Sequence, residues 1–180
     1  PTLQRLAIVK AVLAATIADL PETTSFNIIA FATDVRPWKK DPVRANILNK
    51  AAALVRSRTA EIAALITAEA GLSMKDSTYE AGRVADVLMF GALEVLKDDG
   101  QTFSCDITPH GRQRKVYTQR DPLLGVITAI TPFNHPMNQV AHKVVPSVAT
   151  NNRMVLKPSE KVPFSAILFA DILYEAGLPP

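Results

Sequence analysis

The chain has 180 residues, of which 48% are hydrophobic and 21% are charged, a composition typical of a folded globular protein rather than a disordered one. A net charge of +3 without a cluster of basic residues argues against nucleic-acid binding, and no apolar run approaches the ~20 residues that a membrane-spanning helix needs. The single cysteine excludes an internal disulfide and favours a reducing, cytoplasmic location.

The first forty residues give weak signals. Residues 12–17 predict a short strand, and Ser25–Thr33 has weak helical character. Asp41-Pro42 then predicts a helix start, because an N-cap acceptor precedes a proline at the first helical position. Gly71 predicts the end of this helix. The apolar residues that recur on its expected core face are Val43, Ile47, Leu48, Ala51, Val55, Ile62, Leu65 and Ile66.

A second amphipathic helix is predicted over Asp76–Lys97. Its apolar stripe consists of Ala81, Val84, Val87, Leu88, Ala92, Val95 and Leu96. We then predict an antiparallel hairpin made of two strands, Thr102–Ile107 and Lys115–Arg120. The loop that joins them contains proline and glycine.

From Leu124 onward the pattern changes to strand, turn, helix and strand. Gly125–Thr131 is uncharged and rich in β-branched residues, which predicts a strand buried on both faces. The next helix contains Pro146 and ends at Asn151-Asn152, and the second strand is predicted at Arg153–Lys157. The linking segment is long enough for a parallel crossover. The predicted core face of the helix consists of Met137, Val140, Ala141, Val144, Val145 and Val148.

A last helix is predicted from Pro163 to Gly177. It is mostly apolar all round, which is typical of a buried helix. Together these elements predict an α/β fold with a partial Rossmann-like parallel sheet, flanking helices and an antiparallel hairpin. So small a sheet would have uncovered edges, which favours a chain that is part of something larger.

Asn134 is the first candidate for a catalytic role. It lies where a predicted strand meets a helix, and a neutral side-chain amide there can donate to an oxygen that becomes negative during carbonyl chemistry. The alternative is an ordinary turn or N-cap asparagine before His135-Pro136.

Lys157 and Glu160 are candidates for contact with ribose hydroxyls or a phosphate, since they follow the next strand. A solvated loop is the alternative, because Lys-x-x-Glu is a common pattern. The usual dinucleotide fingerprint with three glycines and the P-loop are absent.

Cys105 and the three histidines give little evidence of metal or nucleophile chemistry. Asp106 beside Cys105 is unfavourable for a thiolate, so we expect a structural role in a strand. No pair of histidines has the spacing of a metal site, and we predict no metal. His142 is expected to be structural, whereas His135 beside Asn134 could donate to an anionic substrate group.

Five motifs occur in order along the second half of the chain. They are Pro122-Leu123-Leu124-Gly125-Val126-Ile127, Thr131-Pro132-Phe133-Asn134-His135-Pro136, Ala141-His142-Lys143-Val144, Leu156-Lys157-Pro158-Ser159-Glu160 and Tyr174-Glu175-Ala176-Gly177-Leu178-Pro179-Pro180. In this order and spacing the chain resembles the N-terminal portion of the aldehyde dehydrogenase superfamily, well over residues 38–180 and poorly over 1–37.

Three further segments resemble the phosphonoacetaldehyde dehydrogenase branch of that superfamily. They are Phe103–Gly111, Glu80-Ala81-Gly82-Arg83 and Ala149-Thr150-Asn151-Asn152.

The resemblance implies NAD(P)-dependent oxidation of an aldehyde, such as phosphonoacetaldehyde, to its carboxylate. In the family a cysteine thiolate adds to the aldehyde, hydride passes to the nicotinamide, and water releases the acyl group. Asn134 matches the oxyanion donor. Lys157 and Glu160 match residues that hold the adenosine ribose, with Ser159 in the same cofactor site. Arg83 and His135 are implied to hold an anionic phosphonate. The wall of the nicotinamide site matches Ile130, Thr131, Pro132 and Phe133.

The resemblance also implies that part of the machinery lies elsewhere. The nucleophilic cysteine, the general-base glutamate and a second glycine-containing turn are expected beyond position 180, and Cys105 does not match the nucleophile. We expect residues 1–100 to supply the N-terminal strand and helices of the cofactor-binding domain. Residues 101–121 resemble an oligomerisation hairpin. Residues 122–180 are expected to form the first βαβα unit of the NAD(P)-binding domain. The catalytic domain is expected to be absent, so that this chain alone is inactive.

Cofactor and partners follow from the same resemblance. NAD is expected, with NADP left open, because a carboxylate at Glu160 would meet the 2′-phosphate of NADP. We expect a small aldehyde as the substrate and a homo-oligomer, either dimer or tetramer. We expect no binding to nucleic acid or to a membrane. The alternative from another class is a non-catalytic remnant or interaction subunit that binds a partner through an exposed sheet edge.

Overall fold

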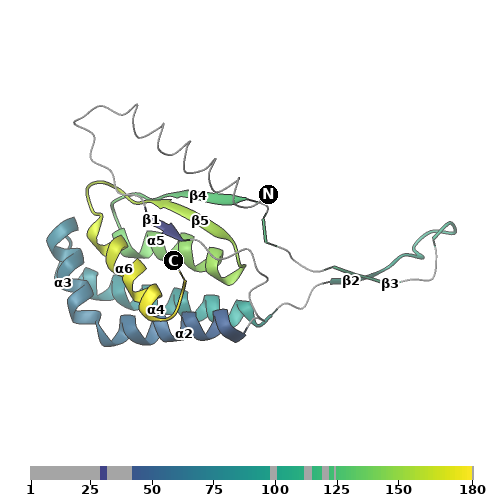
Figure 1. The fold of residues 1–180 in the computed structure, drawn as a ribbon, viewed down its shortest axis with the longest axis horizontal. Coiled ribbons are helices and arrows are strands. Elements are labelled where there is room, and N and C mark those ends of the chain that lie inside the picture. The colour runs from purple at the N-terminus through teal and green to yellow at the C-terminus, as the bar shows by residue number, and fades with distance from the viewer. Residues whose placement is uncertain are drawn as a thin grey trace, which may run out of the picture.

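The computed structural model describes residues 29–31, 42–97, 101–111, 115–118, 122–123 and 125–179. Within these ranges the elements follow the order strand, three helices, two strands, then strand, helix, strand and helix (Figure 1). The strand expected at residues 12–17 and the cap expected at Asp41 lie outside the described residues. The bounds are β1 Ile29–Phe31, α2 Pro42–Ser57, α3 Thr59–Ala70, α4 Met74–Val95, β2 Gln101–Ser104, β3 Lys115–Thr118, β4 Val126–Ile130, α5 Pro136–Ala149, β5 Arg153–Lys157 and α6 Phe164–Glu175.

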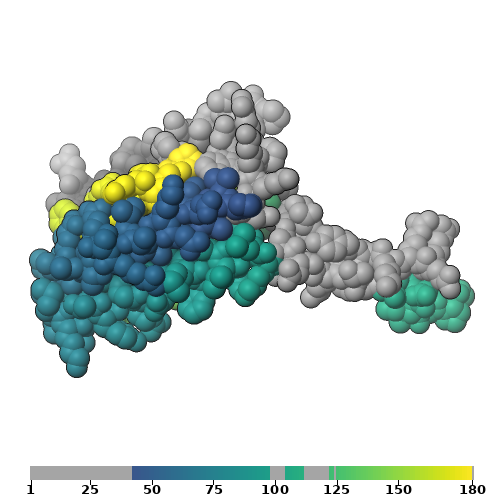
Figure 2. All heavy atoms as spheres, turned by 90° about the horizontal axis from the view of Figure 1, so that it is seen from below, coloured from purple at the N-terminus to yellow at the C-terminus, as the bar shows by residue number. Residues whose placement is uncertain are grey.

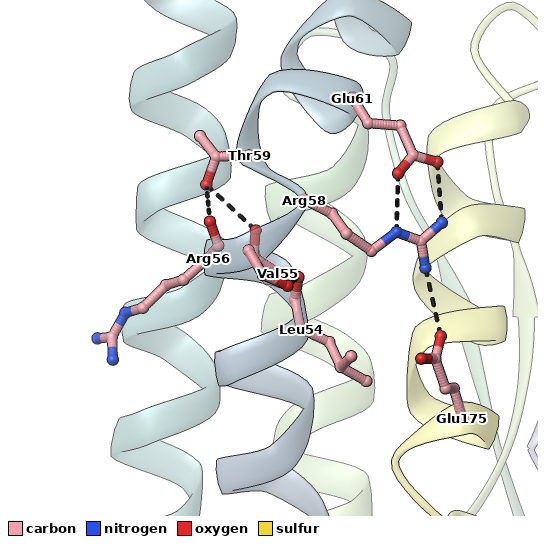
Figure 3. Close-up of polar contacts among 8 residues, drawn as sticks. Leu54, Val55, Arg56, Arg58, Thr59, Glu61 and Glu175 are labelled. Carbon is pink, nitrogen blue, oxygen red and sulfur yellow. Dashed lines mark hydrogen bonds and ion pairs between the residues drawn. The ribbon is translucent and has the colours of Figure 1, made fainter.

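The long helix expected between Pro42 and Gly71 is two helices, so this prediction was wrong in one respect. The break lies at Arg58, whose backbone has φ −103° and ψ 16°. Hydroxyl groups on either side of the break donate to backbone carbonyls. The Ser57 hydroxyl donates to the carbonyl of Leu54, which also accepts from the N–H of Arg58. The Thr59 hydroxyl donates to the carbonyls of Val55 and Arg56 (Figure 3). Such local bonds compete with helical ones.

Arg58 also ties this break to the end of α6. Its guanidinium makes a bidentate contact with Glu61, both nitrogen–oxygen distances being 2.8 Å, and a longer one of 3.5 Å with Glu175 (Figure 3). The hydrogen bond from Arg58 lowers the pKa of the Glu61 carboxyl. The predicted end at Gly71 is confirmed, with the left-handed φ of 70° that glycine tolerates.

Helix α4 begins at Met74, two residues earlier than expected. The Ser73 hydroxyl accepts from the backbone N–H of Asp76 at 3.1 Å, which is an N-cap that sequence inspection overlooked. The predicted stripe is buried at five positions, but Leu96 is 58% exposed and Val87 is only partly buried. In the first stripe Val43 is exposed and Leu65 half-buried, while the other members are buried.

The parallel strand–helix–strand unit is confirmed. β4 pairs with β5 in parallel, and α5 connects them. All six apolar residues predicted for the core face of α5 are buried, and Asn151 follows the helix with a positive φ of 56°. The sheet has a third strand, because β1 pairs antiparallel with β5. The weak helical character assigned to Ser25–Thr33 was therefore wrong at 29–31.

Burial on both faces was a wrong prediction for β4. Ala129 is buried, but Thr128 and Ile130 are exposed and Val126 and Ile127 are intermediate. One face packs toward the helices, so β4 alternates as a half-buried strand does. Helix α6 was also expected to be buried all round; Phe164 is instead 60% exposed and the other side of the helix is buried.

The helices form the core beneath the sheet. α5 packs against both β5 and α4, and α4 packs in turn against α2 and α3 (Figure 1). Seen from below, α2, α3 and α4 cover one face of the molecule (Figure 2). The close approach of α4 and α5 occurs at Gly91, where a Cβ would collide with Val145. No helix in the described ranges is long and apolar enough to cross a membrane.

The predicted hairpin is confirmed, with β2 and β3 paired antiparallel from Gln101 opposite Thr118 to Ser104 opposite Lys115. It extends away from the helices (Figure 1). Cys105 follows β2 in an exposed bend, so the expectation of a structural strand cysteine was wrong. His142 is likewise exposed on α5. Because the side chains of Cys105 and His142 are exposed, neither belongs to the hydrophobic core.

Candidate functional site

The carboxyl ends of β4 and β5 lie side by side. Ile130 is the register partner of Lys157, and the backbone N–H of Thr131 donates to the carbonyl of Lys157 at 3.3 Å. The two turns that follow these strands therefore begin at the same edge of the sheet. In open α/β sheets this is the edge at which ligands bind.

The turn after β4 presents both apolar and polar groups. Ile130 is 68% exposed and Phe133 is 53% exposed, whereas Thr131 is buried. The buried Thr131 hydroxyl has no hydrogen-bond partner among the described residues. Pro132 is exposed between them. The exposed apolar side chains of this turn are available for contact with a ligand, whereas the Thr131 hydroxyl lies beneath the surface.

Asn134 is exposed in this turn, two residues before α5 begins. Within the described part of the chain its side-chain amide makes no hydrogen bond, so the donor is available to a ligand. The position of the amide is therefore set by the backbone of the turn and not by contacts of the side chain itself.

His135 and the start of α5 are held by a carboxylate from another helix. Glu80, on α4, is only 2% exposed. Its Oε1 accepts from the backbone N–H groups of Met137 and Asn138, at 3.0 Å each, and its Oε2 lies 3.2 Å from Nδ1 of His135. Sequence reasoning missed this role. The available signal was an acidic residue within the buried stripe of an amphipathic helix, next to Ala81.

Arg83 lies one turn after Glu80 on α4 and is exposed. Its Nη1 donates to the Tyr79 hydroxyl at 3.3 Å, and its guanidinium lies 5.9 Å from the centre of the Tyr79 ring. This hydrogen bond raises the pKa of Arg83, which keeps the group charged. Arg83 and the residue that holds His135 are thus one turn apart on α4, and no hydrogen bond or ion pair is formed between Arg83 and His135.

Lys157 and Glu160 form an ion pair across the turn after β5. The distance from Nζ to Oε2 is 3.0 Å, and both side chains remain partly exposed. The Glu160 backbone N–H and then Lys157 lower the pKa of the Glu160 carboxyl, so it stays ionised near neutral pH. Ser159 is buried between them and accepts from the backbone N–H of Lys161 at 3.3 Å. The ammonium of Lys161 lies 4.8 Å from the centre of the Phe133 ring, which links the two turns.

Helix α6 begins in the same way as α5. The Glu69 carboxylate, from α3, accepts from the backbone N–H groups of Phe164 and Ser165 at 2.8 and 3.0 Å. Helix N-termini after parallel strands commonly bind phosphate. Here a carboxylate occupies that position on both helices, so we expect no phosphate at either one. Among the described residues, no three histidine, cysteine or acidic side chains gather as a metal site would require.

Comparisons with known proteins agree on one family. The model of the "Aldehyde dehydrogenase family" matches residues 7–180. The chain is 40% identical over 136 residues to 3-sulfolactaldehyde dehydrogenase of Priestia megaterium, covering 76% of this chain and 28% of that protein. It is 37% identical over 137 residues to sulfoacetaldehyde dehydrogenase of Neptuniibacter caesariensis, covering 76% of this chain and 30% of that protein.

Solved structures give the same result. Aldehyde dehydrogenase 21 from Physcomitrella patens, in complex with the reaction product succinate, has a TM-score of 0.73 at 32% identity, over 77% of this chain and 29% of that one. The NADP-dependent glyceraldehyde-3-phosphate dehydrogenase from Bacillus halodurans C-125, complexed with NADP, has a TM-score of 0.73 at 34% identity. The match covers 81% of this chain and 30% of that one. The chain therefore spans less than a third of the length of these relatives.

Proposed function

The chain belongs to the aldehyde dehydrogenase family, and from this premise we propose that it supplies the oxyanion donor and half of the cofactor site for NAD(P)-dependent oxidation of an aldehyde to its carboxylate. The register of β4 against β5 is the observation that supports this best. It brings the turn that contains Asn134 and the turn that contains Glu160 to one sheet edge. A reacting carbonyl and a dinucleotide could therefore meet there.

Asn134 would act on the aldehyde oxygen. When a nucleophile adds to the carbonyl carbon, negative charge develops on that oxygen, and a fixed N–H donor stabilises it more than it stabilises the starting aldehyde. The exposed amide of Asn134 has no competing partner among the described residues, which suits this role. A neutral amide also avoids the repulsion that a carboxylate would impose.

The residues at this edge fit a dinucleotide. The exposed side chains of Ile130 and Phe133 would line the nicotinamide half together with Pro132, and the buried Thr131 would support them from beneath. Lys157 and Glu160 would bind ribose hydroxyls, with the Lys157 ammonium donating and the Glu160 carboxylate accepting, while Ser159 supports the turn. The cofactor, when bound, accepts the hydride from the substrate.

An anionic aldehyde is the substrate class we propose, with phosphonoacetaldehyde as the specific candidate. Arg83 remains charged and exposed, and Nδ1 of His135 is directed to Glu80, which leaves Nε2 as the ring nitrogen for a ligand. Charge-assisted bonds from arginine suit a dianion. Relatives named for sulfolactaldehyde and sulfoacetaldehyde support a negatively charged substrate.

Replacement of Asn134 tests the oxyanion role. The protein expressed from its complete gene is assayed for NAD⁺ reduction with phosphonoacetaldehyde, sulfoacetaldehyde, succinic semialdehyde and betaine aldehyde. We expect the anionic aldehydes to be preferred, and Asn134→Ala to lower kcat by about 10²-fold, because one oxyanion donor is lost. Asn49→Ala, at an exposed position on α2, is the matched control and should leave kcat unchanged.

An unchanged kcat in the Asn134 variant would refute the assigned role. A wild-type protein that binds a partner but reduces no cofactor with any aldehyde would instead favour the non-catalytic interaction subunit. Preference for betaine aldehyde, a cation, would refute the anionic substrate class.

A further inference from the structure

Glu80 is a buried carboxylate that reaches from one helix to the start of another. It lies on α4, is 2% exposed, and makes three hydrogen bonds to described residues, all of them within 135–138. A carboxylate in the interior is costly unless donors compensate its charge. The two backbone N–H groups and the imidazole supply that compensation, so the carboxylate and the start of α5 fix each other.

The start of α5 has no cap of its own. His135 occupies the N-cap position but makes no capping hydrogen bond, and Pro136 has no N–H to offer. Glu80 therefore takes the place of an N-cap side chain, and its negative charge lies at the positive end of the helix dipole. Without Glu80, two N–H groups at the buried start of the helix would lose their acceptor.

The turn that contains Asn134 is consequently held at two points. On the strand side, the N–H of Thr131 donates to the carbonyl of Lys157. On the helix side, Glu80 holds the imidazole of His135 and the N–H groups that follow it. Asn134 lies between these two points, and its side chain makes no hydrogen bond to another described residue.

Helix α4 is a rigid support for this carboxylate. Val84 and Leu88, which follow Glu80 on the same face, are fully buried. At Gly91 the backbone of α4 packs directly against Val145 of α5. The carboxylate and the turn are thus parts of one packed unit, and a change at Glu80 is expected to move the turn rather than α4.

We propose that Glu80 is a positioning residue for the reaction: it sets the place of the Asn134 amide by anchoring the start of α5. This proposal rests on the proposed function, because it assigns Glu80 an effect on turnover through the oxyanion donor. The structural requirement is strict, since a displacement of about 1 Å in a reacting group can lower a rate by roughly 10²-fold.

A double-mutant cycle tests the proposal. In the protein from the complete gene, Glu80→Ala should lower kcat by roughly 10-fold to 10²-fold and leave the Kd for NAD⁺, measured by fluorescence titration, within about 2-fold. In the Asn134→Ala background the same change should lower kcat by only about 2-fold or less, because the group that Glu80 positions is already missing. Full additivity of the two changes would overturn the proposal.

Two further variants distinguish positioning from a general loss of structure. Glu80→Gln keeps an acceptor oxygen for the backbone N–H groups and should restore kcat to within about 3-fold of wild type. Glu69→Ala removes the equivalent cap from α6 and should combine additively with Asn134→Ala. Failure of Glu80→Gln to restore kcat, or coupling of Glu69 to Asn134, would contradict the proposal.

If Glu80→Ala does not fold, Glu80→Asp replaces it in the cycle, because it keeps the charge and shortens the reach by one methylene. The same non-additivity with Asn134→Ala is expected. A wild-type protein that oxidises no aldehyde would refute the proposed function and this proposal with it. An active wild type with additive variants would refute the positioning role alone.

Discussion

Asn134 and Glu160 follow neighbouring strands, and the roles that we propose for them need side chains of different charge. The neutral amide of Asn134 suits an oxygen that gains negative charge, whereas the ionised carboxylate of Glu160 suits hydroxyl donors and repels phosphate. The Glu160 pKa is lowered by its own backbone N–H and by Lys157, so this charge is present at the pH of an ordinary assay. At the scale of single residues, one sheet edge therefore has a neutral donor at Asn134 and a negative charge at Glu160.

Cofactor preference should depend on that charge. Glu160→Gln removes the repulsion of a 2′-phosphate, so we expect the ratio of kcat/KM for NADP⁺ to that for NAD⁺ to rise by roughly 5-fold, as a unit charge a few ångströms away in a watery environment would give. Glu94→Gln, near the far end of α4, changes the net charge equally and is the control. A ratio that does not change would show that Glu160 does not face the adenosine ribose.

At the scale of elements, α4 determines how the helices meet. Its Glu80 anchors the start of α5, and its Gly91 allows the two helices to approach closely. Two glycines of α4 have different surroundings. A Cβ at Gly91 would collide with Val145, whereas a Cβ at Gly82 would meet nothing within 4 Å.

This contrast gives a matched pair of variants. Gly91→Ala should lower the free energy of unfolding by about 1–2 kcal/mol, because the branched Val145 side chain in a packed core cannot move aside without cost. Gly82→Ala should raise it by up to about 1 kcal/mol, since alanine favours the helix. Urea unfolding monitored by circular dichroism measures both, and stabilisation by Gly91→Ala would contradict the close approach.

At the scale of the whole molecule, one hydrophobic core joins the helices to the sheet. It includes residues from α2, α3, α4, α5, α6, β4 and β5. Among the residues that the structure describes, the largest fully buried side chain belongs to Phe169, on the inner face of α6. The turn with Lys157 and Glu160 leads directly into α6, so stability of this core also supports the part of the sheet edge that we propose for the cofactor.

Phe169 should therefore be a major contributor to stability. Phe169→Ala is expected to cost about 3–5 kcal/mol, as truncation of a buried phenylalanine typically does. Phe164→Ala, on the exposed side of the same helix, should change stability by no more than about 0.5 kcal/mol. Thermal or urea unfolding compares the two. Equal losses would show that α6 does not pack as described.

Much of the fold could be predicted from sequence where the signal is local. The bounds of β5 and the core face of α5 were predicted correctly, because periodicity and turn residues determine them. The break at Arg58 was missed because no glycine or proline marks it; the hydroxyl groups of Ser57 and Thr59 bond to backbone carbonyls there instead. The strand at 29–31 was missed because it forms by pairing with β5, which lies more than a hundred residues later in the chain.

By itself, the sequence determined the family, the parallel strand–helix–strand unit, and the placement of Asn134, Lys157 and Glu160 after strands. These features depend on motifs and on short-range periodicity. Only the tertiary structure decided that Glu80 and Glu69 cap α5 and α6, and that His135 contacts α4 at Glu80, one turn before Arg83. The physical reason is that these contacts join residues as many as 96 positions apart, and no local pattern specifies which carboxylate meets which helix end.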